Sequence, residues 1–110
     1  MIVEDELLIA MEVQDLLSDL GAEVVGPFGH LKPAVDAVHR ESLHGAVLDV
    51  RLDGETIQDI AELLIARGVP VVLTTGYEKE QLPPSLQHLP RLRKPFDEKE
   101  LRSLLEQAYR

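Results

Sequence analysis

Four strand-like apolar runs in this sequence end in side chains that could do chemistry together. Glu4 and Asp5 follow "MIV", Asp49 ends "GAVLD", Thr74 and Thr75 end "VPVVLTT", and Lys94 follows "RLR". Three carboxylates held close together repel one another strongly unless a cation lies among them. Mg²⁺ suits such a site because it is a hard cation that takes oxygen ligands. A carboxylate nucleophile beside Mg²⁺, a lysine and a hydroxyl donor predicts phosphoryl transfer onto an aspartate.

These side chains meet only if their strands are parallel neighbours in one sheet. The strand-like runs are "MIV", "AEVVG", "GAVLDV", "VPVVLTT" and "RLRKPF". They alternate with helix-like segments, and such alternation predicts a doubly wound α/β fold with five parallel strands and helices on both faces. In sheets of this kind ligands bind at the carboxyl ends of the strands, at the topological switch point.

Helical periodicity marks the segments between the strands. Residues 6–20 carry an apolar stripe that includes Val13 and Leu20, and Gly21 follows as a C-terminal cap. Near the end of the chain, Asp97 and Glu100 form a capping-box pattern before the last helix. Residues 76–90 contain the adjacent prolines 83 and 84, which lack an N–H donor, so a short or irregular fourth helix is expected there.

Each candidate site residue also has a purely structural interpretation. Glu4 and Asp5 could be favourable charges at a helix N-terminus. Asp49 could be an ordinary strand-end residue, and Lys94 a solvated one. The functional interpretation rests on all of them occurring together at the ends of strands.

Composition narrows the class of protein. Eleven Lys and Arg against twenty Asp and Glu give a net charge of −9, which argues against a nucleic-acid-binding face. The absence of cysteine excludes disulfides and thiol chemistry. The sequence has no Gly-rich phosphate-binding loop, so it gives no support for nucleotide hydrolysis. The four histidines lack the spacing of metal ligands and are interpreted as solvated: His30, His39, His44 and His88. We expect one cytoplasmic domain over residues 1–110, with no membrane segment and no effector domain.

Four motifs resemble those of the bacterial response-regulator receiver domain, in order and over essentially the whole chain. They are "VEDE", "VLDVRLDGE", "VVLTTGY" and "RKPF". The resemblance implies a flavodoxin-like sheet with the strand order 2-1-3-4-5. The Thr-Gly-aromatic sequence after the fourth strand is similar to a receiver subgroup often associated with histidine kinases of the HWE type.

The resemblance also implies a role for each site residue. Asp49 would be the phosphoacceptor, attacking a phosphohistidine on a partner protein. Thr75, rather than Thr74, would bind the phosphoryl group, because a small residue (Gly76) follows it, and Lys94 would pair with that group. The Mg²⁺ ligands would be Glu4, Asp5, Asp49 and the backbone carbonyl of Arg51. The Lys94–Pro95 peptide bond is commonly cis in this family.

The sequence departs from the receiver pattern at three places. The chain begins only three residues before Glu4, and Asp53-Gly54 stands where many receivers have a proline-containing turn. Arg91 occupies the position where many receivers keep a switch aromatic. Tyr77, beside a hinge at Gly76, is the candidate to replace that aromatic, and packing of Tyr77 on the sheet edge is the alternative.

The sequence therefore predicts a stand-alone phosphoacceptor receiver in a His-Asp phosphorelay. It would act on no substrate beyond assisting its own phosphorylation and dephosphorylation. Its partners would be a histidine kinase or a histidine phosphotransfer protein, and a downstream protein target. The alternative is a receiver-like protein-binding module that is not phosphorylated. A haloacid-type phosphohydrolase fragment is disfavoured because Arg51 stands where its second catalytic aspartate would be.

Overall fold

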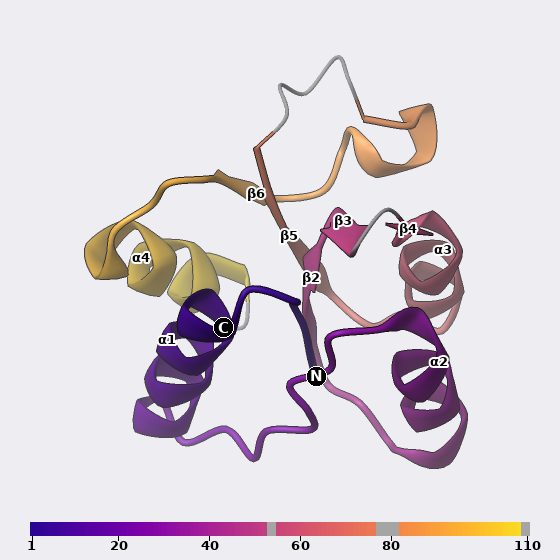
Figure 1. Ribbon diagram of the computed structural model, residues 1–110, viewed down its shortest axis with the longest axis horizontal. Coiled ribbons are helices and arrows are strands. Elements are labelled where there is room, and N and C mark those ends of the chain that lie inside the picture. Colours follow the sequence, from indigo (N-terminus) through magenta and orange to yellow (C-terminus); the bar gives the residue numbers. More distant parts are fainter. Residues whose placement is uncertain (53–54, 77–81, 109–110) are drawn as a thin grey trace.

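A parallel β-sheet forms the centre of the protein (Figure 1). The computed structural model describes residues 1–52, 55–76 and 82–108. Four strands pair in the order β1-β2-β5-β6, all parallel. They are β1 (Ile2–Val3), β2 (Ala46–Asp49), β5 (Val71–Thr75) and β6 (Arg91–Arg93). This order agrees with the expected doubly wound topology of the first, third, fourth and fifth predicted strands.

Helices cover both faces of the sheet, as Figure 1 shows. Helices α1 (Leu7–Asp19) and α4 (Glu98–Ala108) lie on one side, and α2 (Leu31–Arg40) and α3 (Gln58–Ala66) on the other. Successive strand side chains point to opposite faces, so one strand supplies two cores. In β2, Val47 packs with the core of α1 and α4, whereas Leu48 packs with that of α2 and α3.

Local signals fix the helix ends. After α1, the backbone N–H of Gly21 bonds the carbonyl of Ser18 and that of Ala22 bonds the carbonyl of Leu17, which is a Schellman motif. Gly21 has a φ of 90° in that motif. The predicted apolar stripe extends one residue too far, because α1 ends at Asp19. Leu20 is the C-cap residue and is 41% exposed. At α4, the Asp97 carboxylate accepts a hydrogen bond from the N–H of Glu100, as the capping-box pattern predicts.

The prediction of a strand at "AEVVG" is wrong. Within the described residues the parallel sheet has four strands rather than five. The segment still runs beside β1, because the N–H of Ile2 bonds the Val25 carbonyl and the N–H of Phe28 bonds the Ile2 carbonyl. Only an isolated bridge between Val3 and Phe28 remains. Gly26 has a φ of 103°, which is not extended, and Pro27 has no N–H, so a regular ladder is interrupted.

Two short features lie around the carboxyl edge of the sheet. After β2, strands β3 (Arg51–Leu52) and β4 (Glu55–Thr56) form an antiparallel pair, and the predicted turn at residues 53–54 lies outside the described residues. Within residues 82–90 the only helix is a single 3₁₀ turn, η2 (Pro84–Leu86), which agrees with the expected irregular fourth helix. No helix in the described parts of the chain has the length and apolar character to cross a membrane.

Candidate functional site

The sheet brings three predicted carboxylates together. Val3 of β1 and Leu48 of β2 are paired in register, so the residues that follow them, Glu4 and Asp49, come out side by side at the carboxyl edge. Both are only 5% exposed, whereas Asp5 is exposed. One carboxylate oxygen from each of Glu4, Asp5 and Asp49 lies within 4.8 Å of the other two.

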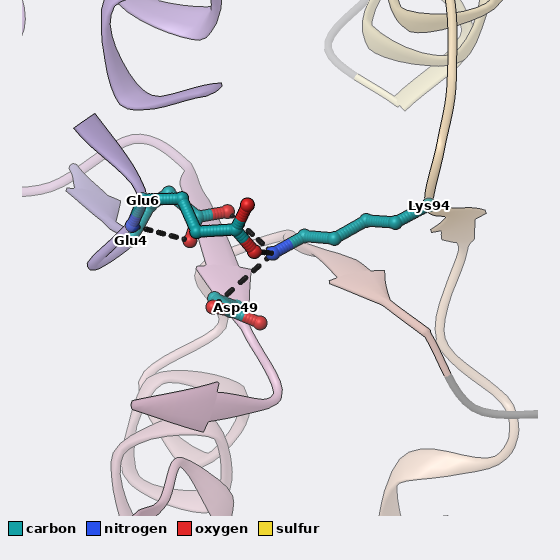
Figure 2. Close-up of polar contacts among 4 residues, drawn as sticks. All are labelled: Glu4, Glu6, Asp49 and Lys94. Carbon is teal, nitrogen blue, oxygen red and sulfur yellow. Dashed lines mark hydrogen bonds and ion pairs between the residues drawn. The ribbon is translucent and has the colours of Figure 1, made fainter. Parts of the chain in front are cut away.

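Lys94 reaches Glu4 and Asp49 from the opposite edge of the sheet, after β6. It follows β6 directly, and its backbone N–H donates to the carbonyl of Thr75 at 2.8 Å. Its Nζ lies 2.9 Å from Glu4 Oε1 and 3.3 Å from Asp49 Oδ2 (Figure 2). The Lys94–Pro95 peptide bond is cis, as the resemblance implies.

The environment of Lys94 stabilises its charged form. Burial by itself lowers the pKa of the ammonium, since desolvation disfavours charge. The contacts with Glu4 and Glu6 and the attraction of Asp49 outweigh burial, so the pKa of Lys94 lies above its usual value of 10.5. Lys94 is therefore positively charged at neutral pH at this edge of the sheet.

The donor set of the cluster fits a hard cation. Glu4, Asp5 and Asp49 carry three formal negative charges against the single positive charge of Lys94, so −3 + 1 leaves −2. Glu4 Oε1 is buried, and no donor in the described residues directs a hydrogen bond at it, although Lys94 lies close as an ion-pair partner. Carboxylate oxygens around an uncompensated charge are the ligands that Mg²⁺ and Ca²⁺ take. The acidic cluster could therefore bind a metal ion.

Two threonines end the neighbouring strand β5. Thr74 pairs in register with Asp49, and Thr75 is the last residue of the strand. Both are buried, and the hydroxyl of Thr74 has no hydrogen-bond partner among the described residues. Both hydroxyl candidates thus lie at the carboxyl edge of the sheet, and the choice of Thr75 over Thr74 stays a prediction.

The remaining predicted residues lie around the cluster. Arg51 opens β3, two positions after Asp49, and the role of its backbone carbonyl stays a prediction. Gly76 is exposed directly after β5, and Tyr77 lies outside the described residues. Arg91, which stands where many receivers keep a switch aromatic, is a partly buried residue of β6. It pairs in register with Leu73 of β5.

Glu6 belongs to the site but was not among the predicted site residues. Its carboxylate accepts a hydrogen bond from Lys94 Nζ at 3.0 Å (Figure 2). The sequence pattern assigns Glu6 to the start of a helix, and in the structure it is the N-cap residue of α1. Its position directly after Glu4 and Asp5, at the same strand end, is the signal that could have identified it.

The fold and the site together define a class of protein: a flavodoxin-like α/β domain with an acidic cluster and a lysine at the carboxyl edge of its sheet. No family model matches the sequence. The solution structure of SdrG from Sphingomonas melonis Fr1 is 36% identical, with a TM-score of 0.82, over 96% of this chain and 90% of that one. The response regulator REC domain of PhyR from Erythrobacter litoralis is 30% identical, with a TM-score of 0.83, over 97% and 87% of the two chains.

A curated relative agrees with these structures. The transcriptional regulatory protein PdtaR of Mycobacterium tuberculosis is 31% identical over 85 residues, which is 74% of this chain. The chain spans 40% of the length of PdtaR. The protein belongs to the response-regulator receiver domain family of two-component signalling.

Proposed function

We propose that this receiver domain accepts a phosphoryl group on Asp49 from a phosphohistidine and signals by changing its shape toward a partner protein. The donor is a histidine kinase or a histidine phosphotransfer protein. The observation that carries the proposal is the convergence of Lys94 Nζ on Asp49 and Glu4 beside Asp5, at the carboxyl edge of the sheet. A buried carboxylate with a purely structural role would not need a lysine and two further carboxylates beside it.

The side chains divide the reaction among them. A carboxylate oxygen of Asp49 attacks phosphorus, and the oxygen–phosphorus bond of the acyl phosphate forms as the phosphorus–nitrogen bond breaks. The electron pair of the broken bond goes to the imidazole of the donor. Lys94 offsets negative charge on the phosphoryl oxygens, and the Thr75 hydroxyl donates a hydrogen bond to one of them.

A divalent cation completes this proposal. Glu4, Asp5 and Asp49, with the backbone carbonyl of Arg51, would hold Mg²⁺. When bound, Mg²⁺ offsets charge on the phosphoryl oxygens in the transition state. The excess negative charge and the buried Glu4 Oε1 support this ligand set. Mg²⁺ would keep some of its waters beside these protein ligands, because it dehydrates reluctantly.

Intact mass spectrometry tests the proposal. The protein is incubated with Mg²⁺ and phosphoramidate, a small phosphodonor, and we expect the mass gain of one phosphoryl group, labile to base. Asp49→Asn should abolish the gain, whereas Asp15→Asn, at an exposed position of α1, should keep it. A wild-type protein that gains no phosphoryl group from phosphoramidate or from a phosphorylated histidine protein would instead be a phosphate-independent binding module.

A further inference from the structure

Glu6 contributes to the site a carboxylate that the proposed ligand set does not use. It occupies the N-cap position of α1, where a short polar side chain usually accepts a hydrogen bond from a backbone N–H of the first turn. The Glu6 side chain makes no such capping hydrogen bond. It accepts one from Lys94 Nζ instead, at 3.0 Å. The Glu6 side chain therefore binds Lys94 instead of capping α1.

Hydrogen bonds tie Glu6 to the acidic cluster at both ends. Its backbone N–H donates to Glu4 Oε2 at 3.1 Å, and its carboxylate holds Lys94, as Figure 2 shows. Glu4 also holds Lys94, through a salt bridge from Oε1 to Nζ at 2.9 Å. Glu6 thus contacts Lys94 from outside the buried cluster, whereas Glu4 contacts it from within.

The ammonium of Lys94 is already fully engaged. An ammonium has three N–H groups, and oxygens of Glu4, Glu6 and Asp49 lie within 3.3 Å of Nζ. A phosphoryl oxygen that pairs with Lys94 must displace one of them. The Glu6 side chain is 59% exposed, against 3% and 7% for Glu4 and Asp49, so it returns to water at the smallest cost.

We propose that Glu6 is a positioning residue that holds Lys94 in the unphosphorylated protein and competes with the phosphoryl group for its ammonium. This inference rests on the proposed function, because it assumes that a phosphoryl group binds at Asp49. Glu6 then sets how readily Lys94 transfers to the phosphoryl group, and so how stable the phosphorylated state is.

Two substitutions separate contact from charge. Glu6→Gln removes the charge and keeps the length of the side chain. Glu6→Asp keeps the charge but removes one methylene, which sets the carboxylate back from Lys94, and aspartate is a favoured N-cap residue that preserves α1. Glu12, on the same helix and outside the cluster, is changed in the same two ways as the matched control.

The first measurement is the affinity for beryllium fluoride with Mg²⁺, a mimic of the bound phosphoryl group. We expect both Glu6 variants to bind the mimic about two- to fivefold more tightly than the wild type, the range that corresponds to losing one exposed ion pair. The Glu12 variants should bind as the wild type does. An effect in Glu6→Gln without one in Glu6→Asp, or weaker binding in either, would overturn the competition.

The second measurement uses the protein without metal or phosphoryl mimic. The ¹H–¹⁵N signal of the Lys94 ammonium should shift in both Glu6 variants and stay unchanged in the Glu12 variants, and an unchanged signal in the Glu6 variants would also overturn the inference. If the wild type binds the mimic and the Glu6 variants equal it, only the role of Glu6 fails. If the wild type does not bind the mimic, this inference and the proposed function fail together.

Discussion

Lys94 Nζ lies 2.9 Å from Glu4 Oε1, and this contact joins the two edges of the sheet. Glu4 follows β1 and Lys94 follows β6, which are the outer strands in the order β1-β2-β5-β6. The lysine side chain therefore crosses the carboxyl ends of β2 and β5, where Asp49 and Thr75 lie, as its extended course in Figure 2 shows. The Lys94–Glu4 ion pair therefore spans the strand ends at which Asp49 lies.

Removing the Lys94 charge should destabilise the fold without abolishing it. Lys94→Met leaves Glu4 and Asp49 buried without their cation, and breaking a partly buried pair in this way costs about 1–3 kcal/mol. Urea unfolding at pH 7 measures the change. Lys99→Met, at an exposed position of α4, is the control and should be nearly neutral. Equal stability of the two variants would show that Lys94 makes no net contribution.

The pH dependence of that difference follows from the raised pKa of Lys94. A lysine whose folded-state pKa is raised contributes stability that is fully present below its unfolded pKa and is lost as the pH rises toward the folded value. The difference in unfolding free energy between wild type and Lys94→Met should therefore be constant from about pH 7 to about pH 10. It should shrink only at higher pH. A difference that already declines between pH 7 and 9 would contradict the raised pKa.

Divalent cations should stabilise the folded protein through the acidic cluster. Free Mg²⁺ at about ten times its Kd adds about 1.4 kcal/mol, which raises Tm by roughly 5 °C for a domain of this size. Asp5→Asn should remove most of that increment, because it deletes one of the three convergent carboxylates. Differential scanning calorimetry at matched ionic strength, with KCl as the reference salt, separates binding from screening. Asp15→Asn should keep the full shift.

The two threonines of β5 should differ in their effect on phosphorylation. Thr75→Ala removes the hydroxyl proposed to bind the phosphoryl group, and we expect phosphorylation by phosphoramidate to slow about tenfold, equivalent to about 1.4 kcal/mol for one hydrogen bond to a charged group. Thr74→Ala removes a buried hydroxyl that has no hydrogen-bond partner in the described part of the chain, so its rate should stay within about twofold of wild type. The reverse order would transfer the phosphoryl contact to Thr74.

The site was predictable because its main residues end strands. Alternation of apolar runs indicates which residues stand at the carboxyl edge, so Glu4, Asp49 and Lys94 could be grouped from the sequence alone. The contact of Lys94 with Glu6 was not predictable in the same way. It depends on the direction of one long side chain at the start of α1, and helical periodicity says nothing about an N-cap residue that turns away from its helix.

The missing fifth strand shows a second limit. The apolar residues of "AEVVG" predict a strand by type, and the segment does bond to β1. Pattern alone could not show that Gly26 leaves the extended region, since glycine permits both hands of φ and gives no signal of which it takes. The φ of Gly26, together with the missing N–H of Pro27, makes this segment irregular rather than a strand.

Alanine at Gly26 should be more destabilising than alanine at Gly21, although both glycines have a positive φ. An added Cβ at Gly21 meets nothing within 4 Å, so Gly21→Ala costs only the backbone term of about 1–2 kcal/mol. At Gly26 the Cβ would lie 2.7 Å from the carbonyl oxygen of Ile2, which itself accepts the N–H of Phe28. Relieving that clash must displace backbone beside β1, so we expect about 3–4 kcal/mol in urea unfolding. Because the hydrogen bond from the Phe28 N–H to the Ile2 carbonyl is the one disturbed, hydrogen exchange at Phe28 should accelerate in Gly26→Ala and not in Gly21→Ala. Equal costs for the two variants would mean that the close approach of Gly26 to β1 does not constrain the fold.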